Sequence, residues 1–351
     1  MSNYEYATQH EIIQKDSFKD ELIKLINNST KKIYFKPSKI PMLYKYGSIK
    51  PYILDNIENG QISLSLVTSF NDYFDTTIHT EVSDTAGKDE TDKMVLMAKN
   101  IGIDDMLGGN SNQLAESLQK AYERNQRTTF SSAEYYGIHV CSFSTNPKST
   151  LMWSHYADNN QGICIGYNYK NLLRDERLLK SMLYPVAYID QPIDATKYLD
   201  VQERVCEFPV DVAIFASILS KATCWSYEKE WRFVSVGDDR KSKYIQYNNI
   251  IKPSLIILGY HWIKPFFSDY NFNEKTSNIK RLLKISVEEK IPIFMTLPHI
   301  GHYSQNLYRI DVNRVLDFIK QQFDNYPTSL EYYTVVHDDL CRMMKDKGEK
   351  V

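Results

Sequence analysis

Two spacings of apolar residues alternate along this chain, and together they predict a mixture of helices and strands. In residues 17–28 the apolar positions recur as on one face of a helix, and they are Phe18, Leu22, Leu25 and Ile26. The same pattern returns near the C-terminus, at Val312, Val315, Leu316, Ile319 and Phe323. Thr328 and Glu331 have the spacing of a capping box, which predicts a last helix running to about Lys345.

Other segments alternate apolar and polar residues with the period of two that is typical of strands. The clearest are residues 62–70, 137–144, 161–168 and 230–236, and residues 254–262 form a more continuous apolar run. A largely buried helix is predicted through residues 213–219. The expected fold class is therefore α+β, with a mixed or antiparallel sheet at its core and helices at the C-terminus.

The polar pattern suggests how the chain is divided. Between about Glu81 and Ser131 the sequence becomes acidic, polar and helix-prone, which predicts a helical insertion at about residues 80–131. We expect residues 1–260 to form an α+β core that contains this insertion. Residues 261–351 are expected to form a mainly helical extension packed on that core.

Composition narrows the class of protein. The 351 residues include 42 Lys plus Arg and 44 Asp plus Glu, without the basic excess of general nucleic-acid binders. The first 18 residues lack the apolar core of a signal peptide, and no stretch approaches the roughly 20 apolar residues of a membrane helix. Five scattered cysteines form no CxxC pair, which argues against a disulfide framework and a zinc site. We expect a cytoplasmic protein with no membrane partner, metal or prosthetic group.

Residues suited to chemistry gather in four clusters. They are LYKY at 43–46, SFNDYFD at 69–75, LMWSHYAD at 151–158 and WSYEKEWR at 225–232. The sequence lacks GxGxxG, GxxxxGK[ST], GxSxG and HExxH, the familiar signatures of nucleotide, phosphate, serine-hydrolase and zinc-protease sites. A functional interpretation therefore depends on these clusters.

In this order, the four clusters resemble an uncharacterised, mainly bacterial family, domain of unknown function 2971. The resemblance covers roughly residues 43–259 and includes Gly162 and the block from Lys221 to Arg232. The turn in that family usually reads FNDPFD, and Tyr73 replaces its proline here. This departure should alter the rigidity of the turn more than its chemistry.

The cluster order has a weaker similarity to ADP-ribosyltransferases. In those enzymes a residue of an early strand holds the ribose of NAD, an aromatic ring packs on nicotinamide, and a late glutamate orients the ribose hydroxyls or the nucleophile. Such a carboxylate stabilises the oxocarbenium-like state through which the bond to nicotinamide breaks. The resemblance thus implies an NAD-consuming transferase or glycohydrolase, of a type that serves bacteria as a toxin or antiviral defence effector.

Carried over to this chain, the resemblance implies two sets of site residues. The catalytic candidates are Glu230, Glu228, His155 and Tyr156. The candidates for binding NAD are Lys45, Tyr46, Asn71, Asp72, Trp153, Lys221 and Arg232. Lys45 stands where those enzymes have His or Arg. The aromatic motif around Tyr156 and the glutamate motif around Glu228 are also far apart in the sequence. The expected ligand is a nucleotide-type small molecule, with a macromolecular acceptor or partner protein.

The last cluster makes a geometric prediction. If residues 225–233 are extended, Glu228, Glu230 and Arg232 share one face of a strand. The opposite, buried face then carries Trp225, Tyr227, Trp231 and Phe233. The charged face is either a solvated ladder of ion pairs or one wall of a polar cleft, and we favour the cleft.

Structural explanations compete with these functional ones. The FNDYFD segment is equally a turn anchored by two buried phenylalanines. Trp153 fits a core position as well as a pocket wall, and His155 fits a buried, hydrogen-bonded histidine.

Two other functions stay open. A metal-dependent nuclease-like effector would use Asp72, Asp75, Glu228, Glu230 and Lys221, since paired acids with a lysine suit a magnesium site. A non-catalytic module would instead use the aromatic and polar pocket to bind a nucleotide or a partner. The transferase needs NAD and tolerates chelator, the nuclease fails in chelator, and the binding module shows neither activity.

Overall fold

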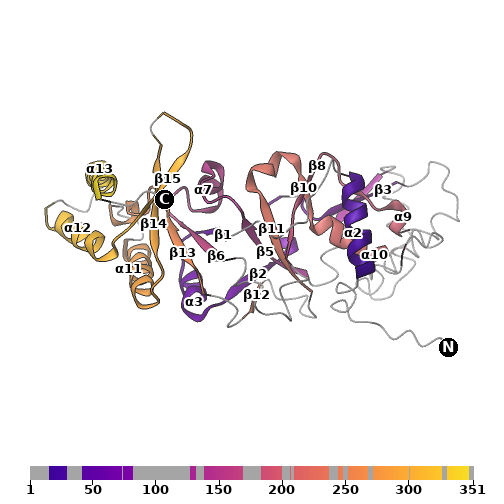
Figure 1. The fold of residues 1–351 in the computed structure, drawn as a ribbon, viewed down its shortest axis with the longest axis horizontal. Coiled ribbons are helices and arrows are strands. Elements are labelled where there is room, and N and C mark those ends of the chain that lie inside the picture. Colours follow the sequence, from indigo (N-terminus) through magenta and orange to yellow (C-terminus); the bar gives the residue numbers. More distant parts are fainter. Residues whose placement is uncertain are drawn as a thin grey trace.

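The fold is known from a computed structural model (Figure 1). It describes residues 16–29, 42–72, 74–81, 127–131, 138–168, 183–199, 206, 209–236, 244–247, 252–267, 272–299, 301–325 and 330–347. Within these ranges no helix combines the length and the apolar character that crossing a membrane requires.

A ten-stranded sheet forms the centre of the described part of the molecule. Eight strands follow one another in the order β12 (Tyr244–Tyr247), β2 (Ile62–Leu66), β5 (Ile138–Ser144), β1 (Met42–Gly47), β6 (Ile163–Asn168), β13 (Leu255–Leu258), β14 (Ile293–Pro298) and β15 (Gln305–Arg309). β11 (Glu230–Val236) branches off to pair with β5 and with β7 (Leu183–Pro185). The pairs are antiparallel except β13 with β14, which confirms an α+β fold with a mixed sheet.

The strand β5 is where the sheet divides. One edge of β5 pairs with β11 along its whole length, from Ser144 opposite Glu230 to Ile138 opposite Val236. On its other edge, β2 pairs near one end of β5 and β1 pairs at Ser144. The middle of β5 therefore faces a gap between β1 and β2, where side chains can line a cavity.

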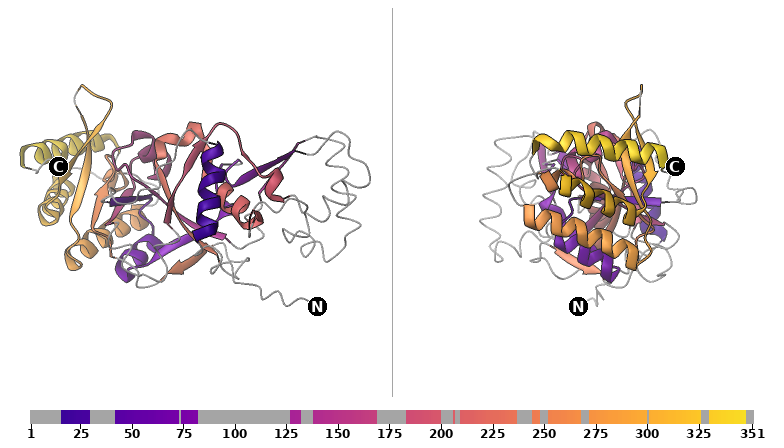
Figure 2. Two further views of the ribbon diagram at one scale, coloured as in Figure 1. Left: turned by 45° about the vertical axis from the view of Figure 1, so that its right-hand side comes forward. Right: turned by 90° about the vertical axis from the view of Figure 1, so that its left-hand side faces the viewer.

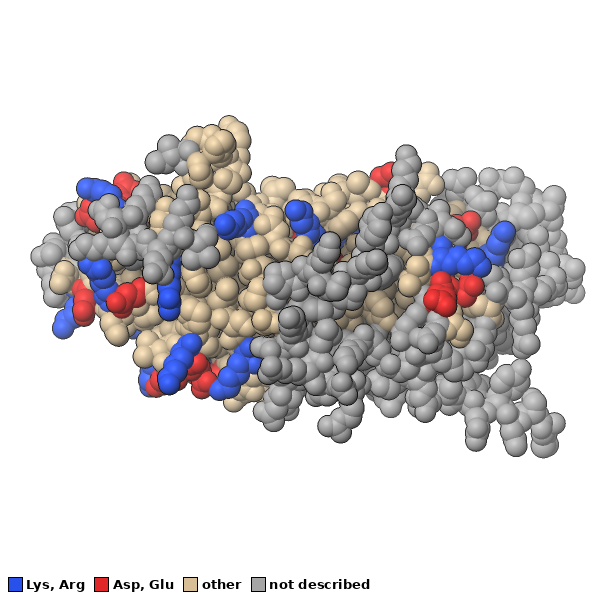
Figure 3. Space-filling model, viewed as in Figure 1, with Lys and Arg blue, Asp and Glu red and all other residues tan. Residues whose placement is uncertain are grey.

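Helices cover both ends of this sheet (Figures 1 and 2). At one end, α2 (Asp16–Ser29) contacts α10 (Pro209–Ile218), which contacts α9 (Thr196–Leu199). At the other end lie α11 (Phe272–Glu288), α12 (Val312–Asn325) and α13 (Leu330–Lys347), and α11 contacts α3 (Pro51–Asn59). Short 3₁₀ helices are η2 (Val67–Ser69), η4 (Thr223–Glu228) and η5 (Lys264–Phe267). On the face drawn in Figure 3, charged side chains of both signs intermingle over the α11–α13 end.

The predicted helix faces are largely confirmed. Leu22, Leu25 and Ile26 of α2 are buried, and the Phe18 side chain lies outside the described part. In α12, Val315 and Ile319 are buried, whereas Leu316 is exposed. The side chain of Phe323 and the capping-box residue Thr328 also lie outside the described residues. The helix predicted at residues 213–219 is α10, whose almost entirely apolar sequence packs inside the core.

Two regions that were expected to be helical also contain strands. The described ends of the predicted insertion are strands, since β3 (Thr77–Glu81) pairs with β4 (Arg127–Ser131). Both ends are rich in β-branched residues, which favour strands, and residues 82–126 lie outside the described part. The described C-terminal region contains the three helices α11, α12 and α13, as a mainly helical extension would, and its strands β14 and β15 extend the main sheet across the expected boundary at residue 260. β14 is an apolar segment buried in that sheet.

The described residues also form two small sheets. β3 also pairs with β9 (Ile193–Asp194), and β8 (Ala187–Ile189) pairs in parallel with β10 (Ser220–Ala222). Strand β10 leads directly into η4 and then β11. This order brings Lys221 close to the glutamates of the fourth sequence cluster.

Candidate functional site

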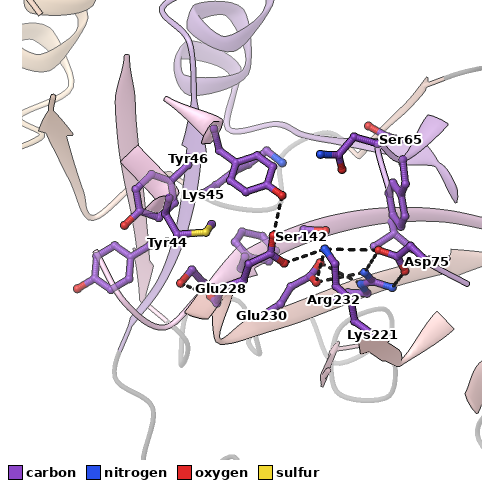
Figure 4. Close-up of a pocket in the computed structure, with 17 residues that line it drawn as sticks. Tyr44, Lys45, Tyr46, Ser65, Asp75, Ser142, Lys221, Glu228, Glu230 and Arg232 are labelled. Atoms are coloured by element: carbon purple, nitrogen blue, oxygen red, sulfur yellow. Dashed lines mark hydrogen bonds and ion pairs between the residues drawn. The ribbon is translucent and has the colours of Figure 1, made fainter. Parts of the chain in front are cut away.

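The four sequence clusters meet at one cavity of about 220 Å³ beside the split in the sheet (Figure 4). Strand β1 contributes Tyr44, Lys45 and Tyr46, and α7 (Thr150–Tyr156) contributes Met152 and Tyr156. The turn after η2 contributes Phe70, Asn71 and Asp75. The segment from β10 to β11 contributes Lys221, Glu228, Glu230 and Arg232. Segments distant in sequence thus share one small polar space, the first cavity.

The first cavity has balanced charge. Its lining includes three carboxylates, Asp75, Glu228 and Glu230, and three cations, Lys45, Lys221 and Arg232. All except Lys45 are buried. A buried charge is costly unless it is paired, so the arrangement depends on its internal ion pairs.

Arg232 is the centre of the buried cluster. Its Nη1 and Nη2 donate to the two Asp75 oxygens at 2.8 and 2.6 Å, and its Nε donates to Glu230 Oε1 at 2.9 Å. Nη2 also reaches Glu230 Oε2 at 3.1 Å, and Nη1 donates to the Ile218 carbonyl at 2.5 Å. The guanidinium lies 5.1 Å from the centre of the Phe70 ring. These contacts occupy every nitrogen, so Arg232 fixes the two acids in place.

Lys221 connects the three carboxylates. Its Nζ donates to Glu228 Oε2 at 2.8 Å and lies 3.5 Å from Asp75 Oδ2 and 3.7 Å from Glu230 Oε2. Burial by itself lowers the pKa of Lys221, but Glu230, Asp75 and Glu228 raise it overall. The amine is therefore charged and holds Glu228 next to the Arg232 cluster.

The turn of the second cluster presents Asp75 to Arg232. Asp72 Oδ1 accepts the Phe74 amide at 3.0 Å, and the Asp75 amide donates to the Asp72 carbonyl at 3.2 Å. Thr76 then adopts φ 64°, a conformation that is uncommon for a β-branched residue. This backbone turns Asp75 inward. Phe74 is 61% exposed, so the idea of a turn anchored by two buried phenylalanines is wrong.

The segment that carries Glu228 is not extended, so the condition for one strand face shared by Glu228, Glu230 and Arg232 is not met. Residues through Glu228 form η4, and Lys229 follows with φ 45°. A left-handed residue with a Cβ costs roughly 1–2 kcal/mol, and here β5 holds the turn. Ser144 Oγ donates to the Glu228 carbonyl at 2.6 Å, and the Thr145 amide donates to the Lys229 carbonyl at 3.1 Å. Glu228 and Glu230 nevertheless face the same cavity.

The aromatic residues of the fourth cluster are divided by this turn. Trp231 and Phe233 lie on β11 and are buried, as predicted. Trp225 and Tyr227 lie in η4 and are only partly buried, so they do not share that face. The Trp225 ring instead lies 4.8 Å from Lys221 Nζ.

The helix α7 aims Tyr156 at Glu228. Ser149 caps α7 by accepting the Met152 amide, and Trp153 Nε1 donates to the Pro147 carbonyl at 2.9 Å. After α7, Gly162 packs so tightly that an added Cβ would lie 2.3 Å from a β1 carbonyl oxygen. With the helix fixed in this way, Tyr156 Oη donates to Glu228 Oε1 at 2.6 Å.

The two glutamates have pKa values shifted in opposite directions. Burial raises the pKa of Glu228, and the opposing effects of Lys221 and Tyr156 do not cancel it. Burial also acts on Glu230, but Arg232 and Lys221 outweigh it and lower the pKa of that carboxyl. Pairs of acids separated in this way commonly take different parts in acid–base chemistry.

Strand β1 supplies the wall opposite the glutamates. Lys45 Nζ donates to Cys141 Sγ at 3.2 Å, and Tyr46 Oη donates to the Asn146 carbonyl at 2.6 Å. The Tyr46 ring meets Trp153 edge to face, with ring centres 5.2 Å apart. Burial strongly raises the pKa of Tyr46, so this residue is a neutral part of the wall.

The structure brings together eight of the eleven predicted site residues in the first cavity: Lys45, Tyr46, Asn71, Tyr156, Lys221, Glu228, Glu230 and Arg232. Three do not line it. Trp153 is fully buried behind Tyr46, Asp72 is occupied in the turn, and His155 is exposed beside Tyr227, with Nδ1 and Oη 3.0 Å apart. Consecutive residues of α7 point in different directions, which separates His155 from Tyr156.

Sequence reasoning missed several lining residues. Tyr44, Ser142 and Ser144 line the cavity, and Ser142 hydrogen-bonds Glu230. Ser142 and Ser144 alternate with buried residues in β5, a pattern that suggested the strand but not what its polar face meets. Asp75 was considered only as a metal ligand, and the structure shows it paired with Arg232.

Three of the acidic residues that a metal-dependent nuclease would use as metal ligands are already paired with cations of the protein. Asp75, Glu228 and Glu230 do come together, but Lys221 and Arg232 lie between them. Among the described residues, no group of three or more His, Cys, Asp and Glu side chains is placed to hold a metal ion. The geometry therefore gives the magnesium hypothesis no specific support.

Comparison with known proteins identifies one similarity. Residues 152–233 match a family described as a protein of unknown function, DUF2971. This range includes α7 from Met152 onward and the segment from Lys221 to Arg232, whereas the clusters at 43–46 and 69–75 lie before it. No curated protein and no solved structure matches the chain. The functional interpretation consequently depends on the geometry of the first cavity.

Proposed function

We propose that the first cavity is the active site of an NAD-consuming transferase or glycohydrolase, with Glu228 as the essential carboxylate. One observation carries this proposal. Glu228, whose pKa is raised, and Glu230, whose pKa is lowered, line the same cavity as Tyr156 and the Lys45–Tyr46 wall. A pair of carboxylates in different protonation environments suits the breaking of a ribosyl bond, which passes through an oxocarbenium-like state.

The contacts favour Glu228 over Glu230 for the chemical role. Arg232 bonds both Glu230 oxygens and holds them in the buried cluster. Glu228 has one oxygen on Lys221 and the other on the half-exposed Tyr156. Glu228 is thus the carboxylate with a contact to a partly exposed, uncharged partner, and a ribose hydroxyl can replace this Tyr156 contact.

The proposed reaction assigns each residue a task. The bond between ribose C1′ and the nicotinamide nitrogen breaks, and its electron pair leaves with nicotinamide. The Glu228 carboxylate stabilises the positive charge that develops on the ribose. Water or an acceptor hydroxyl then attacks C1′, and its proton passes to Glu228. The Tyr156 ring packs on the leaving nicotinamide, while Glu230 remains paired with Arg232.

The direct test measures nicotinamide release from NAD by the purified protein, with and without chelator and cell extract. We expect release that chelator does not affect and that Glu228→Gln reduces by about 10²–10⁴-fold, the usual range for a positioned acid–base group. Glu274→Gln, an exposed residue of α11, is the matched control. Circular dichroism checks that each variant is folded.

Two results would overturn the proposal. The absence of release by the wild-type protein, even with extract, would remove NAD as the substrate. Full activity of Glu228→Gln would remove Glu228 from the chemistry.

Draining NAD or modifying a macromolecule stops growth, so we also propose a role as a toxin or antiviral defence effector. Induced expression of the wild-type protein should then lower cellular NAD, and expression of Glu228→Gln should not.

A further inference from the structure

A second cavity adjoins the first and shares part of its lining. Its volume is about 460 Å³, and it lies among β1, β2, β6 and α3. The two cavities share three lining residues, Lys45, Tyr46 and Ser65. A ligand that extends past these side chains would occupy both spaces.

Volume indicates that the first cavity holds only part of a large ligand. Its 220 Å³ is below the roughly 300–1,000 Å³ of typical small-molecule sites. A dinucleotide consists of two nucleosides joined by a diphosphate, and the reacting nicotinamide riboside is the smaller share. The remainder needs an adjoining space, and the 460 Å³ of the second cavity is in the usual range.

The charge of the second cavity differs from that of the first. Its described lining includes Lys50, the shared Lys45, and no Asp or Glu, whereas three acids line the first cavity together with Lys45, Lys221 and Arg232. Lys50 is the N-cap of α3, without a side-chain cap bond, so the positive end of the helix dipole adds to the two lysines. This excess of positive charge favours an anionic ligand.

Polar and aromatic side chains complete the second cavity. Asn56 Nδ2 donates to Ser63 Oγ at 2.7 Å on its polar wall. Tyr52 lines it and is 52% exposed, and Tyr167 lies buried in it. An exposed ring beside a cationic pocket suits a planar base, because bases stack on aromatic side chains.

We propose that the second cavity binds the adenosine diphosphate half of the dinucleotide whose nicotinamide half reacts in the first. The identity of this ligand rests on the proposed function. Lys45 and Lys50 pair with the diphosphate, and the adenine packs against Tyr52. Binding energy from this half positions the reacting half beside Glu228.

Binding of ADP tests this site without any turnover, because ADP has no nicotinamide bond to cleave. Isothermal titration calorimetry should show that Lys50→Glu weakens ADP binding at least tenfold. A glutamate near a helix N-terminus favours the helix, so this variant keeps α3 folded. The matched control is Lys320→Glu on α12, which lines neither cavity and should bind ADP normally.

A second variant, with adenosine and pyrophosphate as fragments of ADP, tests the base contact and the diphosphate contact separately. Tyr52→Ala should weaken binding of ADP and of adenosine, but not of pyrophosphate, by roughly 5–150-fold, the loss of one base–aromatic stack. Lys50→Glu should weaken ADP and pyrophosphate but not adenosine. Equal ADP binding by Lys50→Glu and Lys320→Glu, or no ADP binding by the wild-type protein, would overturn the proposal.

The outcomes separate the two proposals. Nicotinamide release from NAD without Lys50-dependent ADP binding would preserve the proposed function and reject the second cavity as a nucleotide site. Lys50-dependent ADP binding without nicotinamide release would do the opposite, and the protein would then be a nucleotide-binding module.

Discussion

Two arginines in this protein each bond two carboxylates, but their surroundings are opposite. Arg232 bonds Asp75 and Glu230 at 2.6–3.1 Å and has no solvent exposure. Arg281 of α11 bonds Asp55 and Glu58 of α3 at 2.5–3.2 Å, with 36% of its side chain exposed. The bond lengths are alike, so the difference between the clusters is their access to water.

That difference decides what each cluster contributes. Water and salt screen the Arg281 pairs, and such pairs are typically worth about 0–1 kcal/mol. Removing the charged groups of the Arg232 cluster from water costs several kcal/mol per ion. Only the complete set of ion pairs and hydrogen bonds offsets this desolvation penalty. The main effect of the buried cluster is therefore to fix the positions of the carboxylates and to shift their pKa values, rather than to stabilise the fold.

The largest expected effect comes from breaking the buried cluster. Arg232→Met should lower the free energy of unfolding by about 3–5 kcal/mol, because it leaves Asp75 and Glu230 buried with only the longer contacts to Lys221, at 3.5 and 3.7 Å, to offset their charge. Urea unfolding at pH 7 measures this change. A decrease in the free energy of unfolding of less than about 1 kcal/mol would show that Arg232 and Arg281 contribute similarly to stability.

The same variant has a predicted pH dependence. The folded protein lowers the pKa of Glu230, so the stability from this group is present at neutral pH and is lost as the pH falls through its folded value. Arg232→Met removes that contribution. The stability difference between wild type and variant should therefore narrow as the pH falls.

An intermediate effect is expected from Tyr156→Phe, which removes one hydrogen bond to Glu228. Hydrogen bonds to charged groups contribute about 1.5–3 kcal/mol, and this one lowers the pKa of Glu228. Its loss should raise that pKa and move the acid limb of nicotinamide release to higher pH. The destabilisation measured by urea unfolding should shrink as the pH falls and Glu228 becomes protonated. A destabilisation independent of pH would contradict this assignment.

The smallest effect is expected in the exposed cluster. Arg281→Met makes the same chemical change as Arg232→Met, but water solvates Asp55 and Glu58 after the arginine is lost. The cost should be below about 1 kcal/mol and should diminish further in high salt. A loss as large as that of Arg232→Met would remove the distinction between the two clusters.

Local sequence patterns predicted much of the fold. The alternation in residues 137–144 and 161–168 corresponds to β5 and β6, and the apolar spacing in residues 17–28 corresponds to α2. These predictions succeed because a strand or helix places side chains on its faces with a fixed period. The four clusters also contained most of the residues that line the first cavity.

Several features depended on contacts between distant segments. Nothing local distinguishes Asp72 from Asp75, but the left-handed Thr76 and the position of Arg232 turn Asp75 inward. Bonds from β5 hold the turn at Lys229, which places Glu228 in a 3₁₀ helix instead of a strand.

The sequence by itself determined the helices and strands with clear apolar periodicity, such as α2, β5 and β6, and which residue types are available for chemistry. The tertiary structure decided that Lys221 joins three carboxylates, that Glu228 and Glu230 have opposite pKa shifts, and that a second cavity adjoins the first. Side-chain periodicity is a local property of the backbone. Burial and charge pairing arise only when strands distant in sequence meet, as β1, β5 and β11 do here.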